Sequence, residues 1–287
     1  MTTSIDEPSR AIETRRARRG LAPSALALIL VATGVPEAAA TTMTSAAADD
    51  GGGPRELLIT YRSDARDRPA FRAYLAGEGR APFEKLVQDG TLKGYQILFN
   101  SFVSSYTWDA MVVLDFRSFA DTRRWAEIER VSPGGLSARG LKLARPVDTY
   151  SADLSWQGAL PGTTDRNGVF YVIPYDYASA AAYRSYVNSY VIPQVEGWMR
   201  EGVLAGYRIY MNRYPVGKPW DSLFVYQYRD LEAFGERDEV VAKVREGLKS
   251  DPAWQKLNEI KQTIRTESEN TIAESLGSSA SALPPAR

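Results

Sequence analysis

An internal repeat constrains the fold of this chain more than any other feature of its sequence. Residues 94–97 (Gly-Tyr-Gln-Ile) align with residues 206–209 (Gly-Tyr-Arg-Ile) at a shift of 206 − 94 = 112. The shift needs no gap from residue 57 to residue 117. It keeps several distinctive residues in register: Asn100 with Asn212, Trp108 with Trp220, Asp109 with Asp221, Val113 with Val225 and Arg117 with Arg229. Chance rarely preserves such pairs, so the sequence predicts a duplicated unit.

Each copy carries the same predicted order of elements. An apolar first strand (57–61 and 169–173) precedes a helical pattern, which is clearest in the second copy at Tyr183, Tyr186, Val187, Tyr190 and Val191. We expect Pro193 to break that helix and begin a second segment, as Pro82 does in the first copy. Two strands, a helix and a fourth strand follow at 94–102, 108–116, 119–131 and 147–156 in the first copy, and at 206–214, 220–228, 231–248 and 264–276 in the second.

The order βαββαβ is that of a ferredoxin-like unit. The sequence therefore predicts an α+β fold with a first ferredoxin-like repeat at 56–157 and a second at 166–276. The second repeat gains a helix opened by Ser250-Asp251-Pro252, a cap with Pro just inside. Both faces of strand 94–102 are largely apolar, so we expect each sheet to be covered on both faces. Two repeats can cover each other's open faces as a pseudo-dimeric α+β barrel, which predicts a monomer with an internal pseudo-dimer or a weak homo-oligomer.

The composition excludes several kinds of site. The chain has no Cys and no His, so it cannot form a disulfide or a catalytic triad that uses either residue, and we predict no metal site and no cofactor. Thirty-five basic residues balance thirty-five acidic ones, which leaves no electrostatic footprint for nucleic acid. The remaining partner that we expect is a small-molecule ligand.

The first residues are typical of a targeting signal. Arginines at 15, 16, 18 and 19 precede an apolar stretch at 21–35 and small residues at 38–40, so we predict a signal peptide at 1–40 and a periplasmic or secreted protein. The stretch is too short to span a bilayer, and we expect no membrane span in the mature chain. Arg18-Arg19 also fits a twin-arginine signal, so the export route stays open. We expect a flexible linker at 41–55 and a disordered tail at 277–287.

The chain resembles the dimeric α+β barrel superfamily over about residues 56–276. The resemblance rests on the Pro-broken first helices, the segments at 90–95 and 202–207 that run from Gly to Gly-Tyr, and the Trp-Asp pairs that open the third strands. It implies ligand sites inside the barrel or between sheet and helices, in a superfamily that includes cofactor-independent monooxygenases, haem enzymes, lyases, isomerases and non-enzymatic proteins. Haem binding through a proximal His is disfavoured, because the chain has none.

Matched polar residues near the strand ends are the first candidate site. Asn100 and Asn212 are predicted to be buried, either to orient a ligand or to hydrogen-bond a neighbouring loop. Trp108 and Trp220 could form pocket walls with Asp109 and Asp221 as general bases. Alternatively, each Trp plugs the sheet end while each Asp closes its loop. Both interpretations stay open for each pair.

A second candidate group belongs to the C-terminal repeat. Arg208 and Tyr210 share strand parity with Asn212, but they replace Gln96 and Leu98 of the first repeat. The second repeat is also rich in tyrosine, which suits one pocket in the C-terminal half: Tyr171, Tyr175, Tyr207, Tyr210, Tyr214, Tyr226 and Tyr228.

Two functions follow, and no catalytic residue is assigned. The favoured hypothesis is an exported protein that binds a small apolar or aromatic molecule without catalysis. The alternative is a cofactor-independent, monooxygenase-like enzyme, in which Asn212, Trp220, Arg208 and a tyrosine position the substrate. One enclosed polar cavity that contains both Asn212 and Arg208 would favour the enzyme.

Overall fold

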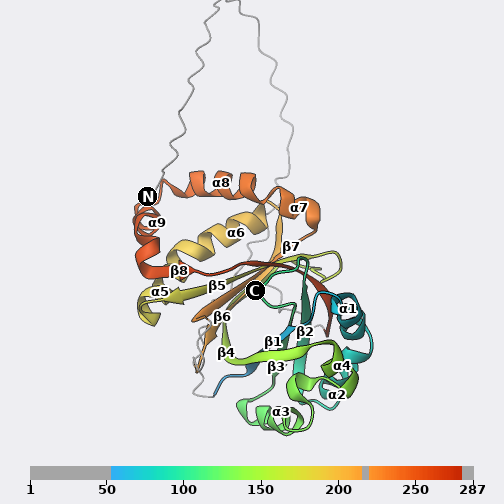
Figure 1. The fold of residues 1–287 in the computed structure, drawn as a ribbon. Coiled ribbons are helices and arrows are strands. Elements are labelled where there is room, and N and C mark those ends of the chain that lie inside the picture. The colour runs from blue at the N-terminus through green and yellow to red at the C-terminus, as the bar shows by residue number, and fades with distance from the viewer. Residues whose placement is uncertain (1–52, 215–219, 280–287) are drawn as a thin grey trace, which may run out of the picture. The chain divides into compact units, whose positions relative to one another are not determined.

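A computed structural model of the chain describes residues 53–214 and 220–279 (Figure 1). The predicted signal peptide, most of the predicted linker and the end of the predicted tail lie outside these residues. Within the described ranges, no helix has the length and apolarity that crossing a membrane requires.

The first half of the described chain alternates strands and helices in the predicted order, with one short helix, α4, that the sequence did not predict. Its elements are β1 (Glu56–Arg62), α1 (Arg68–Ala76), α2 (Ala81–Gln88), β2 (Leu92–Asn100), β3 (Ala110–Phe116), α3 (Thr122–Glu129), α4 (Ala138–Leu143) and β4 (Arg145–Ala159). Strand β4 extends beyond the predicted 147–156 at both ends. Trp108 and Asp109 lie in the loop before β3 and not in the strand itself.

The second half follows a similar order and ends differently from the first. Its elements are β5 (Val169–Tyr177), α5 (Ala180–Tyr186), α6 (Ile192–Arg200), β6 (Leu204–Asn212), β7 (Ser222–Tyr228), α7 (Leu231–Gly235), α8 (Arg237–Leu248), α9 (Pro252–Ile264), β8 (Arg265–Glu267) and β9 (Thr271–Ser279). The predicted cap of α9 is confirmed, because the Asp251 carboxylate accepts hydrogen bonds from the N–H groups of Ala253 and Trp254. The predicted tail begins too early, since residues 277–279 pair with β2.

The two prolines act differently from each other. Pro82 lies in the first turn of α2, after a real break in the helix at Gly77. The predicted break at Pro193 is wrong, because a π-helical segment (Val187–Val191) joins α5 directly to α6. In a π-helical turn the backbone hydrogen bonds reach one residue further. The missing N–H of Pro193 therefore falls where the hydrogen-bond register changes, and the helix continues through it.

The strands form one antiparallel sheet that closes on itself. Its order is β7-β6-β4-β1-β3-β2-β9-β5-β8, and an additional pairing of β7 with β5 closes all strands except β8 into a barrel. Within the first half the order is β4-β1-β3-β2, and within the second it is β9-β5-β7-β6. The two halves meet along β4–β6 and β2–β9. Helices α1–α4 lie outside one part of the barrel and α5–α9 outside the other (Figure 1).

Strand pairing corrects the ungapped alignment of the two halves. Ile97 pairs with Val112 in the first half and Ile209 with Phe224 in the second, which preserves the shift of 112. Across the first strands, Ile59 pairs with Val112 and Ile173 with Phe224, so the shift there is 173 − 59 = 114. A displacement of two residues leaves every side chain on its original face, so the hydrophobic pattern alone could not reveal it.

Among the described residues, the buried side chains form three clusters. One fills the space between the sheet and the helices of the first half, and a second does the same in the second half. The third occupies the interior of the barrel and draws on strands from both halves: Leu58, Leu98, Met111, Val113, Tyr150, Ala152, Phe170, Val172, Tyr210, Trp220, Leu223, Val225 and Ala273. The middle of the barrel is therefore packed with side chains.

Candidate functional site

The strand directions give the barrel two distinct ends. Strands β2 and β6 finish at one end, which we call the Asn100 end. Strand β1 begins, and strands β3 and β7 finish, at the other end, which we call the Glu56 end. The residues singled out from the sequence divide between them. Asn100, Asn212, Trp108, Trp220 and Asp221 lie at the Asn100 end. Tyr210 lies in the barrel interior, and Arg208 lies nearer the Glu56 end.

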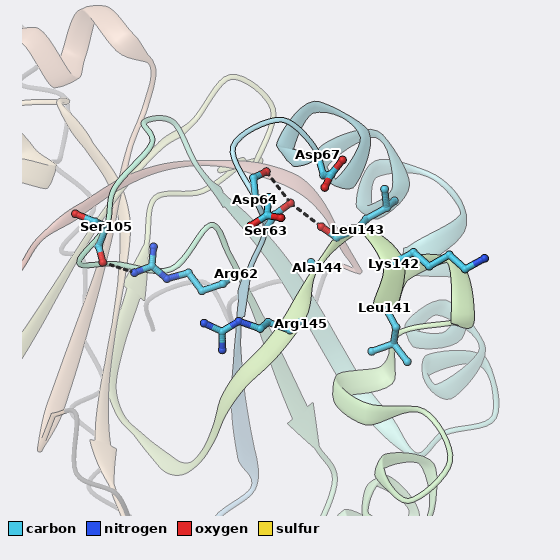
Figure 2. A pocket seen from close by; sticks show the side chains of 10 residues that line it. All are labelled: Arg62, Ser63, Asp64, Asp67, Ser105, Leu141, Lys142, Leu143, Ala144 and Arg145. Atoms are coloured by element: carbon cyan, nitrogen blue, oxygen red, sulfur yellow. Dashed lines mark hydrogen bonds between the residues drawn. The ribbon is translucent and has the colours of Figure 1, made fainter.

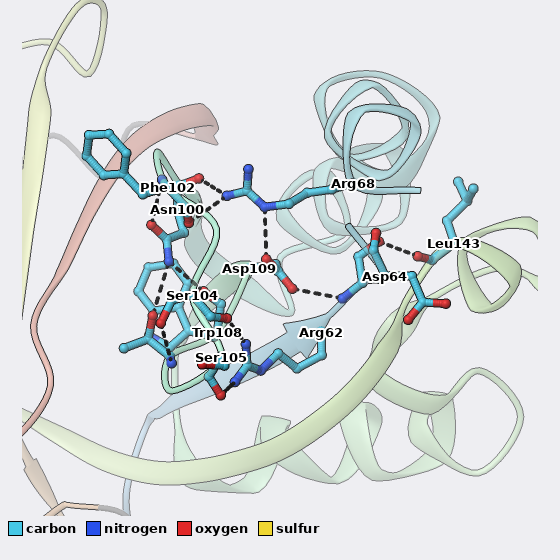
Figure 3. Close-up of polar contacts among 12 residues, drawn as sticks. Arg62, Asp64, Arg68, Asn100, Phe102, Ser104, Ser105, Trp108, Asp109 and Leu143 are labelled. Carbon is cyan, nitrogen blue, oxygen red and sulfur yellow. Dashed lines mark hydrogen bonds and ion pairs between the residues drawn. The ribbon is translucent and has the colours of Figure 1, made fainter. Parts of the chain in front are cut away.

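At the Asn100 end, the asparagines bind their own loops. The Asn100 side-chain amide donates to Thr107 Oγ1 at 3.1 Å and to the Trp108 carbonyl at 3.0 Å, and its Oδ1 accepts from the Phe102 N–H at 3.0 Å (Figure 3). Asn212 donates in the same way to the Trp220 carbonyl at 3.0 Å. These contacts agree with the loop-closing interpretation, and a ligand contact at either residue stays a prediction.

The aspartates at this end also connect backbone segments. The Asp109 carboxylate accepts from the Ser63 N–H at 2.9 Å and from Arg68 Nε at 2.9 Å, and Arg68 also donates to the Asn100 carbonyl (Figure 3). The Asp221 carboxylate accepts from the Tyr177 N–H at 3.0 Å. Trp220 is buried against Tyr150, with ring centres 5.3 Å apart. Each Asp thus ties the strand that precedes a helix to the hairpin loop beside it.

The Glu56 end brings together polar side chains from both halves. The Arg208 guanidinium donates to Gln96 Oε1 at 2.8 Å across the barrel. The Gln96 amide in turn donates to Asp165 Oδ2 at 3.1 Å, and Ser275 Oγ lies 3.2 Å from the same oxygen. This chain of contacts connects β6, β2, β9 and the loop between β4 and β5.

Two carboxyl groups lie next to this chain of contacts. Glu56 on β1 and Asp115 on β3 are direct cross-strand partners. Burial raises the pKa of Glu56 to about 7, and repulsion from Asp115 adds to the rise, while a hydrogen bond from the Leu154 N–H opposes it. Burial also raises the pKa of Asp115, although Lys93, Arg55 and Arg208 partly offset the effect. One carboxyl group therefore changes its charge near neutral pH.

Tyr210 completes the group from inside the barrel. Burial raises the pKa of its phenol, while the neighbouring Arg208 acts in the opposite direction. The phenol therefore stays protonated at neutral pH and can donate a hydrogen bond. Together, the Arg208 guanidinium, the Gln96 amide and the Tyr210 hydroxyl supply donors beside a carboxyl group that can accept a proton. We call Glu56, Gln96, Asp115, Arg208 and Tyr210 the Glu56 cluster.

The loop at 160–168 contacts the Glu56 cluster through the hydrogen bond between Asp165 and Gln96. Besides the contacts of Asp165, the Gln227 amide donates to the Thr164 carbonyl at 2.8 Å. Asp165 and Arg208 are both partly exposed, so this side of the cluster is accessible to solvent. The carboxylate of Asp165 occupies a position among hydrogen-bond donors that an anionic ligand could also use.

Several expected groupings are not formed. Arg208 and Asn212 both face inward on β6, but four residues of strand separate them by about 13 Å, and they lie in different hydrogen-bond networks. The C-terminal tyrosines do not line one pocket. Tyr210 is inside the barrel, Tyr214 is 54% exposed, and the remainder pack on the helix-facing side of the sheet: Tyr171, Tyr175, Tyr207, Tyr226 and Tyr228.

The sequence interpretation missed the carboxyl groups of this site. Glu56 shares strand parity with Leu58, and Asp115 shares it with Met111 and Val113, all of which face the barrel interior. A charged residue at an inward position of a doubly buried strand is the signal that could have identified both, because isolated buried carboxylates are costly. Within the part of the chain that the structure describes, no group of three or more acidic side chains is arranged to hold a metal ion.

Neither family models nor curated proteins match this sequence. Solved structures do. A candidate monooxygenase from Lactobacillus acidophilus NCFM aligns at 14% identity and a TM-score of 0.50, over 79% of this chain and 96% of its own. A candidate monooxygenase from Fusobacterium nucleatum aligns at 10% identity and a TM-score of 0.52, over 79% of this chain and 95% of its own. An anthrone oxidase-like protein aligns at 10% identity and a TM-score of 0.52, over 79% of this chain and 93% of its own.

The closed antiparallel barrel, the external helices and these structural neighbours agree. The fold is that of the dimeric α+β barrel superfamily. In this dimeric α+β barrel a single chain contributes the strands of both halves. At the Glu56 end, the two halves contribute different polar side chains. At these identities the likeness concerns the fold, so a function has to be argued from the Glu56 cluster itself.

Proposed function

We propose that this protein is a cofactor-independent enzyme that removes a proton from a small activated aromatic molecule bound at the Glu56 end of the barrel. The observation that carries the proposal is the raised pKa of Glu56, about 7, in a buried position beside Asp115 and within the Glu56 cluster. A general base works best when its pKa lies near the operating pH, and burial beside a second carboxyl group brings Glu56 there.

The surrounding donors suit an anionic intermediate. When Glu56 takes a proton from carbon or from a phenol, negative charge develops on the substrate oxygen. The Arg208 guanidinium, the Gln96 amide and the Tyr210 hydroxyl all belong to the Glu56 cluster and can stabilise that charge. Apolar side chains fill the barrel interior around Tyr210, so the aromatic rings of such a substrate would have to displace some of them.

The reaction that we favour is oxidation by O2 of an anthrone-type compound. Two fold neighbours are candidate monooxygenases and one is anthrone oxidase-like, which supports this reaction class by analogy alone. One anthrone and one O2 give one anthraquinone and one water. The methylene carbon loses two hydrogens, which leave in the water with one oxygen atom, and the other oxygen atom becomes the new carbonyl. The substrate supplies the electrons, so no further reductant is needed.

The test measures O2 consumption and anthraquinone formation with anthrone as the probe. We expect turnover by the wild-type chain, with kcat/KM rising as pH passes through about 7, and a loss of about 10²-fold or more in Glu56→Gln. Glu239→Gln is the matched control, because Glu239 is an exposed carboxylate on α8. Equal rates in the wild type, both variants and buffer would refute the proposal.

A second candidate function is binding without chemistry, which the hydrogen-bonded Asp165 favours, because an anionic ligand could take the place of its carboxylate. In this case the ligand displaces Asp165 and meets Arg208 and Gln96. Quenching of tryptophan fluorescence by anthrone, without O2 uptake and weakened in Arg208→Gln, would favour binding over catalysis.

Two further statements about the chain belong to the proposal. We infer that the two halves arose by duplication of a ferredoxin-like unit, because each follows the same strand order within the sheet. We also propose that the first 40 residues direct export, so that the barrel acts in the periplasm or outside the cell.

A further inference from the structure

A hollow lies at the Asn100 end of the barrel (Figure 2). It has a volume of about 410 Å³ and lies between the end of β1, the loop after β2 and the junction of α4 with β4. We call it the Arg62 cleft. Its walls include the basic residues Arg62, Lys142 and Arg145 and the acidic residues Asp64 and Asp67. The cleft and the Glu56 cluster lie at opposite ends of β1.

Two arginines lie side by side on paired strands in this cleft. Arg62 on β1 is the direct partner of Arg145 on β4, and Figure 2 shows their side chains extending in the same direction. Like charges directly opposite each other in a sheet are destabilising. An anion between the two guanidinium groups would remove that repulsion.

Two neutral acceptors hold the Arg62 guanidinium in place. Its Nη1 donates to the Ser104 carbonyl at 2.5 Å and its Nη2 to the Ser105 carbonyl at 2.6 Å. These acceptors are neutral, so they orient the guanidinium but do not compensate it. An arginine has five N–H donors, so the remaining ones are available to a ligand.

The neighbouring acidic groups have cationic partners, and Asp64 and Asp67 share one of them, Arg66. Asp109 is paired with Arg68 at 2.9 Å, and the carboxylates of Asp64 and Asp67 lie 3.7 Å and 3.4 Å from Arg66. Arg145 and Lys142 are exposed, and across residues 53–214 and 220–279 neither forms an ion pair. The cleft therefore keeps an excess of uncompensated positive charge.

We infer that the Arg62 cleft binds a small molecule through a carboxylate or phosphate group, held between Arg62 and Arg145. Planar guanidinium groups match the geometry of such oxyanions and can bind them with two parallel hydrogen bonds. The volume of about 410 Å³ leaves room for an organic body attached to the oxyanion.

Two probes, inorganic phosphate and acetate, test this inference on the full chain at low ionic strength. Titration calorimetry should show saturable binding of at least one probe, and comparison of the two identifies the favoured oxyanion. Arg145→Gln should weaken binding about tenfold, equivalent to about 1.4 kcal/mol, whereas Arg130→Gln, which changes an exposed arginine on another surface, should leave it unchanged. Arg62 is not replaced, because it also holds the loop after β2.

A second measurement shows whether the Arg145 variant remains folded. Without ligand, its melting temperature should equal or exceed that of the wild type, because a repulsive pair has been removed. Added phosphate or acetate should then raise the melting temperature of the wild type and not that of Arg145→Gln. Equal binding by both arginine variants, or no saturable binding of either probe by the wild type, would overturn the inference. Neither result bears on the Glu56 cluster.

Discussion

Arg208 donates a hydrogen bond to Gln96 across the barrel at 2.8 Å, and the two residues occupy equivalent positions, 112 residues apart, on β6 and β2. Position-matched residues of the two halves thus meet in the barrel interior, but they are no longer alike. The same asymmetry recurs beside them, where Asp115 corresponds to Gln227 (227 − 115 = 112) and Glu56 to Phe170 (170 − 56 = 114). The acids come from one half and the guanidinium from the other, so the site exists only where the halves meet.

Glu56 should make the stability of the protein depend on pH. Folding raises the pKa of Glu56 from 4.5 to about 7, so the folded state favours the protonated carboxyl group. The resulting contribution to the free energy of unfolding is fully present below pH 4.5 and is lost as the pH rises through about 7. The loss is about 3 kcal/mol over that interval. Glu56→Gln keeps an acceptor for the Leu154 N–H and should abolish this slope. Urea unfolding at several pH values measures it, and a slope that survives in the variant would contradict the assignment.

Arg208→Gln should destabilise the protein more at pH 8 than at pH 5.5. The Arg208 charge opposes the rise in the pKa of Asp115, so its loss leaves the buried acids of the Glu56 cluster less compensated when they are ionised. We expect a loss of about 1–2 kcal/mol at pH 8 and less at pH 5.5. Chemical unfolding at both pH values gives the comparison, with Arg130→Gln as the control. Equal losses at the two pH values would show that Arg208 acts only through packing.

Asn100→Asp should be more damaging than Asn100→Ala. The amide of Asn100 donates to two acceptors, the Thr107 hydroxyl and the Trp108 carbonyl. Alanine removes these bonds at a cost of about 2 kcal/mol, whereas a carboxylate would place negative charge against both oxygens and cost more. Thermal unfolding ranks the variants. Wild-type stability in both would mean that Asn100 does not hold the loop.

Either half of the barrel alone should fail to behave as a stable monomer. Strands β4 and β2 lose their partners β6 and β9 when the chain ends near Asp165, which opens two sheet edges and exposes the interior apolar face. The truncated chain should aggregate, dimerise or remain partly unfolded, while the mature chain unfolds in one transition. Light scattering and calorimetry distinguish these outcomes. A monomeric half with its own sharp transition would contradict this expectation.

Protein recovered from the periplasm should begin near Thr41 or Asp49. Both positions follow runs of small residues suited to signal cleavage. N-terminal sequencing of the secreted or periplasmic fraction measures this directly. An intact Met1 on protein found only in the cytoplasm would end the export proposal.

The sequence by itself predicted the order of most strands and helices and the closure of the sheet, but not the short helix α4 or the separate strand β8. Repetition, apolar periodicity and the Asp251-Pro252 start are local properties, and a strand with two apolar faces has to be covered on both. It could not determine the two-residue difference between the first strands, because that displacement preserves the face of every side chain. It also could not show that Pro193 would continue a helix.

Only the tertiary structure decided which polar residues meet. Arg208 and Asn212 are neighbours along one strand, yet strand rise separates them into different networks. Pairing of β1, β3 and β2 brings Glu56, Asp115 and Gln96 together within the first half, and barrel closure brings Arg208 of the second half to them. The pKa of Glu56 depends on burial and on a carboxyl group 59 residues away (115 − 56 = 59), and both are consequences of strand pairing that no local pattern encodes.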